Sequence, residues 1–416
     1  MSDQCPNEVN YLPKRSWTCL IKQLKKNATA IALLHNGDRI SYGTLQKRVY
    51  NLATHLERLG IKKDDRIGIW LPNTPEWIEA FFACTYLGAI AVSINTRFGT
   101  TEVADILNRS GCKALFIFSN PSDDKYLSRL SQIGKNLRTE LEIVITIQEF
   151  SGGVDNLENI QIIPYAELIQ SRSLSSLSKT ATSSSKCIMF TTSGTTSMPK
   201  LVVHSQNGIA SHAKDIAKTI KLDMPSAVVL QAIPFCGVFG FSQAVAAISS
   251  GASILCLPSF DPINTLDLIK YHRVTHLNGS DEMFHRLINE STSPSDFDSV
   301  TFCGYANFTP SLTDIVETSE QFGLALVGLY GASELLAFLA IQRPGSPESH
   351  RRRMGGVPVS KNTEVRVRDP ETGEALPKGE IGELEFKCVS QMECYFHNPD
   401  ATELAITPDG FFKSGD

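Results

Sequence analysis

The sequence has 416 residues, of which 42% are hydrophobic and 20% charged, and its 39 basic and 44 acidic residues give a formal net charge of −5. This length allows two or three domains, because single cores rarely grow beyond about 300 residues. The balance of charges gives no sign of a nucleic-acid or anionic-membrane partner. The basic cluster of Arg351, Arg352 and Arg353 is interpreted as a solvated loop.

Cysteine usage and hydropathy indicate the compartment. The ten cysteines are scattered, form no C-x-x-C pair and mostly lie in apolar runs, as buried reduced thiols do. The N-terminal segment MSDQCPNEVNYLPKRSW has no signal-peptide core, and the longest apolar stretch, FFACTYLGAIAVSI, is too short to cross a bilayer. These features predict a soluble, cytoplasmic protein without a membrane span.

The first part of the chain alternates between helical and strand periodicity. Leu45, Val49, Leu52 and Leu56 recur at helical spacing, and Gly60 follows as a stop signal. The predicted elements are a helix at 42–60, a strand at 66–72, a helix at 75–89, a strand at 90–94, a helix at 101–111 and a strand at 113–118. Repeated strand-helix-strand units predict an α/β lobe with a mostly parallel sheet covered on both faces.

One helix start and one boundary can also be predicted. Thr74 and Pro75 have the residue types of a helix cap and of a first helical position. A serine-rich stretch at 171–186 has almost no apolar content, which favours a surface connection between lobes. The first lobe is therefore predicted to cover residues 1–180.

A second alternation predicts a second doubly covered α/β lobe over residues 181–345. Its predicted helices lie at 208–220, 241–251, 264–272, 281–290 and 312–323, and its predicted strands at 227–235, 252–258, 274–280, 300–305 and 325–331. From residue 346 to 416 short strands and turns follow one another, and they predict a small all-β subdomain or a small distorted β-barrel.

The segment FTTSGTTSMPKLVVHS, residues 190–205, puts a polar loop between two apolar runs. The apolar flanks predict a strand-turn-strand unit, and the Walker pattern fails because Pro199 replaces its second glycine and Leu201 its hydroxyl. A glycine, several hydroxyls and a lysine still suit a triphosphate. A mobile polar hairpin is the alternative.

The loop TTSGTTSMPK resembles the signature of the adenylate-forming superfamily, which includes acyl- and aryl-CoA synthetases, with Ser197 in place of a glycine. The resemblance covers nearly the whole chain. The segment ISYGTLQKRVYNLATHLERLG is similar to the opening lobe of the family, LYGASE to its Y-G-x-T-E motif, and DGFFKSGD to its T-G-D motif. The fold it implies is that of the N-terminal domain of acyl-CoA synthetases.

The resemblance implies a two-step reaction. A carboxylate attacks the α-phosphorus of ATP, pyrophosphate leaves, and a thiol then takes the acyl group from the adenylate. ATP, Mg²⁺ and CoA are the implied ligands, with the phosphopantetheine of a carrier protein as an alternative acceptor. Positioning and charge neutralisation do most of this chemistry.

Site residues carry over from the matching motifs. Thr192, Lys200 and Glu334 are the implied catalytic residues, and Glu334 is also the implied Mg²⁺ ligand. The implied ATP-binding residues are Thr191, Thr192, Ser193, Gly194, Thr195, Thr196, Lys200, Gly304, Tyr305, Ala306, Tyr330, Gly331, Ala332, Ser333 and Asp416. Without the resemblance, Glu334 and Asp416 read as surface acids and Tyr330 as a core residue.

The implied acid pocket is lined by Phe235, Gly237, Val238, Phe239, Ser280 and Gly328. Gly237 stands where the family often has a gating histidine, so the pocket is expected to be open there. Amino-acid-activating members have an aspartate after this segment, and GFSQAVAA has none. A fatty, aryl or alicyclic acid is therefore favoured, although Asp281 could act as that acid or as a helix cap.

Other chemistries fit less well. GASEL lacks the second glycine of a serine-hydrolase elbow at Ser333. His272 and His276 lie at a strand entry with no glutamate between them, which disfavours a zinc helix. A degenerate nucleotide-binding module remains an alternative from another class.

Family members continue beyond T-G-D into a mobile C-terminal domain, which is absent here, so a truncated chain with impaired adenylation is expected.

Overall fold

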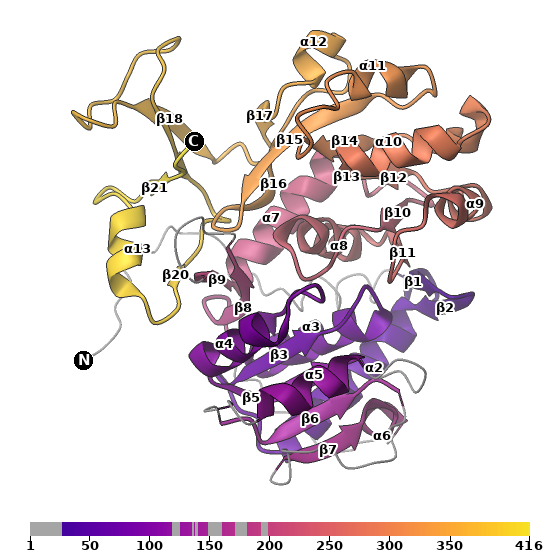
Figure 1. The fold of residues 1–416 in the computed structure, drawn as a ribbon, viewed down its shortest axis with the longest axis vertical. Helices are drawn as coiled ribbons and strands as arrows, with labels where there is room; N and C mark the ends of the chain where they lie inside the picture. Colours follow the sequence, from indigo (N-terminus) through magenta and orange to yellow (C-terminus); the bar gives the residue numbers. More distant parts are fainter. Residues whose placement is uncertain are drawn as a thin grey trace.

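The computed structural model describes residues 27–118, 125–134, 137, 140–148, 160–170, 181–192 and 199–416. Within these residues the strands form four sheets (Figure 1). The predicted serine-rich connection lies mostly outside the described residues.

The largest sheet has the strand order β20-β9-β8-β4-β3-β5-β6-β7. Its members from β8 to β7 run parallel, whereas β9 and β20 are antiparallel to their neighbours. The strands are β3 (Arg66–Trp70), β4 (Ile90–Ser93), β5 (Cys112–Ile117), β6 (Ile143–Thr146), β7 (Gln161–Pro164), β8 (Lys186–Thr191), β9 (Leu201–Ser205) and β20 (Cys394–Tyr395).

Helices cover both faces of this sheet. In β5, Ala114 and Phe116 belong to one core cluster, and Leu115 and Ile117 belong to another, as the period of two in a strand requires. The first cluster includes α2 (Tyr42–Arg58) and α3 (Pro75–Leu87), and the second includes α4 (Thr100–Ser110) and α5 (Lys125–Gly134). The prediction of a doubly covered parallel sheet is confirmed. Helix α6 (Tyr165–Gln170) follows β7.

A second sheet has the order β12-β10-β11-β1-β2, with only β2 antiparallel. Its strands are β1 (Ile31–His35), β2 (Asp38–Ser41), β10 (Val228–Gln231), β11 (Ser253–Cys256) and β12 (His276–Leu277). Val229 and Ile254 face the core shared with α7 (Gln206–Thr219) and α8 (Val238–Ser250). Leu230 and Leu255 face α9 (Pro262–His272) and α10 (Asp281–Glu290).

A third sheet has the order β13-β14-β15-β16-β17. Its strands are β13 (Gly279–Ser280), β14 (Cys303–Ala306), β15 (Leu326–Ala332), β16 (Leu336–Ile341) and β17 (Val357–Pro358), and the short helices η1 (Pro294–Phe297), α11 (Ile315–Glu320) and α12 (Glu348–Arg351) lie nearby in the chain. Strands β13, β14 and β15 are parallel, and β16 returns antiparallel to β15.

The basic cluster is only partly the solvated loop that was expected, because Arg352 and Arg353 are exposed beyond α12 whereas Arg351 is buried. Arg351 ends α12 with 4% of its surface exposed, pairs with Glu320 and donates from Nη1 to the carbonyl of Leu326 at 2.8 Å. A buried guanidinium with these partners joins α11, α12 and β15.

The small β-barrel prediction is wrong, because residues 346–416, all of which are described, form no closed barrel. Strands β18 (Glu364–Arg368), β19 (Glu383–Lys387) and β21 (Phe412–Lys413) make an antiparallel sheet of three strands. The other two strands of the region, β17 and β20, pair with the third and first sheets instead. With helix α13 (Pro399–Ala405), this sheet forms the yellow part of the molecule (Figure 1).

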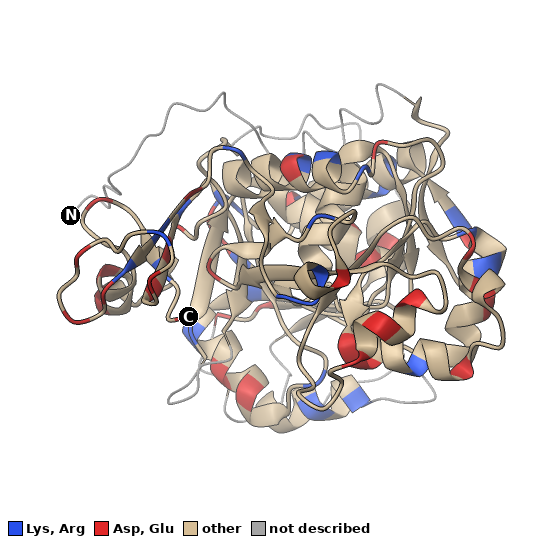
Figure 2. Ribbon diagram, turned by 90° about the horizontal axis from the view of Figure 1, so that it is seen from above, with Lys and Arg blue, Asp and Glu red and all other residues tan. Residues whose placement is uncertain are grey.

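Charges of both signs are mixed along the ribbon (Figure 2). In β18 and β19, charged residues alternate with apolar ones. Among the described helices, none combines the length and the apolar character needed to cross a bilayer.

Candidate functional site

The polar loop connects two antiparallel strands. Thr191 at the end of β8 pairs with Leu201 at the start of β9, which confirms the predicted strand-turn-strand unit. The loop is closed at its base, because the Thr192 amide donates to the carbonyl of Lys200 at 3.0 Å and the Lys200 amide donates to Thr192 Oγ1 at 3.2 Å. The predicted residues Ser193, Gly194, Thr195 and Thr196 lie outside the described residues.

A residue that the sequence did not single out also holds the base of this loop. Arg109 in α4 donates from Nη2 to the carbonyl of Pro199 at 2.7 Å, and it forms an ion pair with Asp105 one turn earlier. The contact joins residues that are 90 positions apart. The side of the loop next to Lys200 is therefore tied to a helix on the first sheet.

Tyr395 brings two predicted catalytic residues together. Its hydroxyl donates to Glu334 Oε1 at 2.7 Å, and the Lys200 Nζ lies 4.5 Å from the centre of its ring. Strand β20 carries Tyr395 against β9, opposite Val202, and the Met392 amide donates to the carbonyl of Glu334 at 2.6 Å. The Lys200 ammonium thus lies over the ring of Tyr395, and the Glu334 carboxylate accepts from the hydroxyl of the same side chain.

Gly331 and Ala332 end β15, and Ser333 and Glu334 lie in the turn that leads to β16, after which the backbone is strained. Leu336 and Phe338 are buried, yet both have positive φ angles, 63° and 62°. Such angles are unfavourable for bulky residues and occur where neighbouring contacts enforce them. A Cβ on Gly331 would lie 2.6 Å from the Ala337 Cα, so only hydrogen fits there.

Two buried histidines bind carbonyl groups of this turn and of β16. His204 Nε2 lies 2.8 Å from the carbonyl of Ser333, and His212 Nε2 lies 2.7 Å from the carbonyl of Ala337. Because a carbonyl only accepts, each Nε2 carries a proton. Burial lowers the pKa of both rings, to about 4 for His204, so both are neutral near pH 7.

Tyr330 and Asp416 meet at the other side of the turn. The Tyr330 hydroxyl donates to Asp416 Oδ2 at 2.6 Å, and its ring stacks on Phe386 with centroids 5.4 Å apart. Burial, together with the Asp416 carboxylate, raises the pKa of Tyr330, which keeps the phenol protonated. Asp416 is exposed and Tyr330 half-buried.

These segments converge on one small core cluster. Its buried members come from β9, the β15–β16 hairpin, β19, β20 and β21, and they are Val202, Leu335, Leu339, Phe386, Met392, Tyr395 and Phe412. Tyr330 and Ala332 pack against it. The cluster explains how motifs far apart in the sequence reach one place.

Several predicted residues lie side by side on the third sheet. Ser280 pairs with Ala306, and Tyr305 pairs with Gly328, near the carboxyl ends of parallel strands, where α/β proteins usually bind ligands. Gly304 donates its amide to Asn278 Oδ1 at 2.9 Å. A Cβ on Gly328 would lie 2.1 Å from the carbonyl oxygen of Arg353, so this position has no room for a side chain.

Tyr305 and Asp281 are structural in this arrangement. Tyr305 is 2% exposed and donates its hydroxyl to the carbonyl of Arg352 at 2.9 Å, and burial raises its pKa to about 12. Asp281 is fully buried and accepts from the amides of Phe308 and Thr309 at 3.0 and 2.6 Å. Asp281 therefore holds the loop after β14.

The start of α8 is close to the turn. Gly237 caps this helix, Val238 and Phe239 are half-buried in its first turn, and the Phe239 ring lies 5.2 Å from that of Phe338. Phe235, in contrast, is fully buried and stacks on Trp77 at 5.4 Å. Phe235 therefore belongs to the core cluster against which Val238 and Phe239 pack.

The residues fit a magnesium ion that has one protein ligand. Among the described residues there is no group of three or more His, Cys, Asp or Glu side chains that could hold a metal together. Glu334 is half-buried, and the neutral Tyr395 hydroxyl occupies only Oε1. A hard cation that keeps several waters and takes one or two carboxylates with substrate phosphates matches this donor set.

A profile of the AMP-binding enzyme family matches residues 20–396. The chain belongs to this family of AMP-binding enzymes, which confirms the resemblance drawn from the motifs. Because the match covers most of the chain, it gives no support to the expectation of an impaired fragment.

Individual relatives are distant and often longer. The chain is 28% identical to the 2-methylpropanoate–CoA ligase of Humulus lupulus over 91% of its length and spans 70% of that protein. It is 26% identical to the naringenin synthase of Pestalotiopsis fici over 95% of its length and spans only 14% of that protein. A solved structure, the anthranilate CoA ligase AuaEII in complex with anthranoyl-AMP, matches with a TM-score of 0.86 at 21% identity, covering 98% of this chain and 76% of that one. This likeness shows a common fold.

Proposed function

We propose that this chain uses ATP to activate a carboxylic acid and passes the acyl group to the thiol of CoA. In the first step a carboxylate oxygen bonds to the α-phosphorus of ATP, and the bond from that phosphorus to the leaving pyrophosphate breaks. In the second step the thiol sulfur bonds to the acyl carbon, AMP leaves and the thiol proton passes to solvent. The relatives named as CoA ligases support this reaction class.

The observation that carries the proposal is the meeting of Lys200 and Glu334 on Tyr395 at the base of the polar loop. In this proposal Lys200 and the loop hydroxyls, with Thr191 and Thr192 at their base, bind the β- and γ-phosphates. Glu334 would hold Mg²⁺, which neutralises phosphate charge. A fixed cation near the leaving group favours the charge that develops as pyrophosphate departs.

The remaining roles follow the same pattern. Tyr330 packs on the adenine, flanked by Gly304, Ala306 and the backbone of the buried Tyr305, and Asp416 accepts hydrogen bonds from the ribose hydroxyls. The acid lies near Gly237, Val238, Phe239, Ser280 and Gly328. An acid without an amine is favoured, because Asp281 is already occupied by three backbone amides and a hydroxyl.

The test is acid-dependent exchange of labelled pyrophosphate into ATP, with a panel of fatty, aryl and alicyclic acids. Acids that bind should also raise the melting temperature in the presence of ATP.

In Lys200→Ala we expect the affinity for Mg·ATP to fall about tenfold or more, the scale of one charge-assisted contact. The control Lys214→Ala removes an exposed lysine of α7 and should change nothing. Equal Mg·ATP affinity in Lys200→Ala and in the unmodified chain would contradict the assignment.

A second candidate differs in the acceptor. The match to naringenin synthase, of which the chain spans 14%, favours a protein that works as one part of a longer assembly. In that case the acyl group would pass to the phosphopantetheine of a carrier protein. Acyl-CoA formation with free CoA separates the two candidates, and absence of ATP binding would support the degenerate module.

A further inference from the structure

The strand pairing that carries Asp416 is short. Strand β21 pairs with β19 through only two residue pairs, Glu385 with Lys413 and Phe386 with Phe412. Beyond it, the Leu384 amide donates to the carbonyl of Asp416 at 3.0 Å, and Ser414 donates to the carbonyl of Leu384. So short a ladder at a sheet edge is weak without further support.

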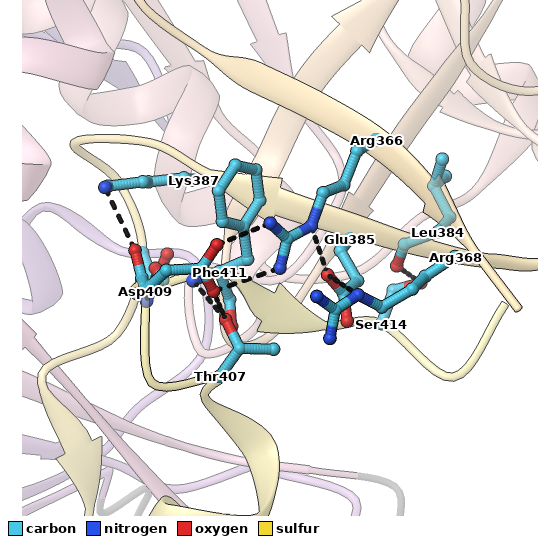
Figure 3. A network of polar contacts seen from close by, with 11 residues as sticks. Arg366, Arg368, Leu384, Glu385, Lys387, Thr407, Asp409, Phe411 and Ser414 are labelled. Atoms are coloured by element: carbon cyan, nitrogen blue, oxygen red, sulfur yellow. Dashed lines mark hydrogen bonds and ion pairs between the residues drawn. The ribbon is translucent and has the colours of Figure 1, made fainter. Parts of the chain in front are cut away.

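A network of charges joins β18 and β19 to the turn before β21 (Figure 3). The Arg366 guanidinium donates from Nη1 and Nη2 to the two carboxylate oxygens of Asp409 at 2.5 and 3.1 Å, and from Nε to Glu385 Oε2 at 2.6 Å. It also lies 3.7 Å from the centre of the Phe411 ring. Paired contacts of this kind are among the stronger and more directional ones in proteins.

Glu385 makes the network unusual. This side chain is fully buried, and among the described residues its Oε1 has no hydrogen-bond partner. Arg368 adds a second cation, with its Nε 3.7 Å from Glu385 Oε2. Because removing one member of a buried pair leaves an uncompensated charge, the network has a strong preference for one arrangement.

The network ends in the turn that leads into β21. Thr407 donates from Oγ1 to Asp409 Oδ1 at 2.7 Å and accepts from the Phe411 amide at 2.9 Å. Lys387 donates from Nζ to the carbonyl of Asp409 at 3.1 Å. The Arg366 side chain holds the pKa of Asp409 well below its usual range, so this carboxyl stays ionised. The turn that holds Asp409 is thus tied to β19 twice, through Arg366 to Glu385 and through Lys387.

We propose that Arg366, Glu385 and Asp409 are positioning residues for Asp416, so that this network sets how well the site distinguishes a ribose from a deoxyribose. The inference rests on the proposed function, in which Asp416 accepts hydrogen bonds from the ribose hydroxyls. If the turn relaxes, β21 shifts along β19 and the Asp416 carboxylate leaves its position beside Tyr330. Because few contacts place the Asp416 carboxylate, a small shift of β21 should weaken its directional hydrogen bonds to the ribose. The binding of the phosphates at Lys200 should be less affected.

The experiment compares the Kd values of ATP and 2′-deoxyATP, measured by calorimetry with Mg²⁺ on the 416-residue chain. The unmodified chain should prefer ATP about tenfold, as expected for one hydrogen bond to a carboxylate. Asp409→Asn keeps the acceptor for Thr407 and removes the charge, and Arg366→Lys keeps the charge and removes the paired geometry. In both, the preference should fall to about twofold.

Two controls make the outcome decisive. Lys270→Gln removes an exposed lysine that pairs with Asp267 and Asp296 on the far side of the second sheet, and it should keep the full preference. The side chain of Asp409 is 54% exposed, so Asp409→Asn should fold even if Arg366→Lys does not. A lower melting temperature with the full preference for ATP retained would overturn the proposal. Failure of the unmodified chain to bind ATP would instead refute the proposed function.

Discussion

At the scale of single residues, neutral side chains donate hydrogen bonds to acceptors of the site. His204 binds the carbonyl of Ser333 in the turn, and His212 binds the carbonyl of Ala337 in β16. Tyr395 binds the Glu334 carboxylate. Neutral donors satisfy acceptors without adding a charge that would compete with a metal ion for Glu334. Partners of a ligand side chain commonly set the affinity of a metal site.

Removing the Tyr395 hydroxyl tests this arrangement. Tyr395→Phe keeps the ring beneath Lys200 and removes the donor to Glu334, so the carboxylate loses its orientation. We expect the Mg²⁺ concentration that gives half-maximal ATP binding to rise about tenfold, with ATP binding in the absence of Mg²⁺ unchanged. Titration calorimetry at several Mg²⁺ concentrations measures both.

The matched control is Tyr42→Phe, which removes a buried hydroxyl that donates to the carbonyl of Ala252 at 2.8 Å, away from the site. It should lower stability without changing the dependence on Mg²⁺. An unchanged dependence in Tyr395→Phe would show that the hydroxyl does not orient Glu334.

At the scale of elements, helix starts show what the residue type at a cap position can predict. Thr74 precedes α3 as predicted, but its side chain makes no cap hydrogen bond and its Oγ1 is buried without a partner among the described residues. Ser280 does cap α10, accepting from the Met283 amide at 3.1 Å. Residue type therefore predicts the position of a helix start better than it predicts the bond.

Ser280 has two assigned roles, as a cap and as part of the proposed acid pocket, and they can be separated. Ser280→Ala should lower the free energy of unfolding by about 1 kcal/mol, the usual effect of losing a cap. It should also reduce the thermal shift caused by the bound acid. Asp261→Ala removes the cap of α9, which accepts from the Asn264 amide at 2.8 Å, and should affect stability alone. Equal acid-dependent shifts in the two variants would remove Ser280 from the pocket.

At the scale of the whole molecule, the sheets combine segments from distant parts of the chain. Strand β1 pairs with β11, and β8, β9 and β20 extend the sheet that β3 to β7 begin. Buried polar groups also join helices within this assembly. Glu79 in α3 is fully buried, where Tyr165 in α6 donates its hydroxyl to Oε2 and Arg48 in α2 lies 3.2 Å from Oε1.

The stability of the fold should depend on pH through Glu79. Burial raises the pKa of this carboxyl to about 8 from its model-compound value of 4.5. Between these values the folded state holds a proton that the unfolded state releases, so the free energy of unfolding falls as the pH rises from about 4.5 to about 8. Glu79→Gln should remove this part of the slope.

Urea unfolding at about pH 5 and about pH 9 measures the effect. Glu102→Gln, which neutralises an exposed acid in the first turn of α4, should keep the slope of the unmodified chain. A slope of the same size in Glu79→Gln would mean that another group titrates.

The sequence by itself determined the succession of helices and strands, because burial periodicity is a local property. It also predicted the strand-turn-strand loop and, through motifs, the positions Lys200, Glu334, Tyr330 and Asp416. Short strands after residue 346 were predicted from the sequence, but their partners were not, since pairing depends on which sheet edges lie nearby. The barrel prediction failed for that reason.

Only the tertiary structure decided which side chains meet. Tyr395, Arg109 and His204 touch the predicted site across long separations in sequence and belong to none of the motifs from which its residues were predicted. Phe235 and Tyr305 were predicted to line the site but are buried in the core, because an apolar or aromatic residue reads alike whether it faces a ligand or a neighbouring helix. Local pattern determines the elements, and contacts between distant elements determine the site.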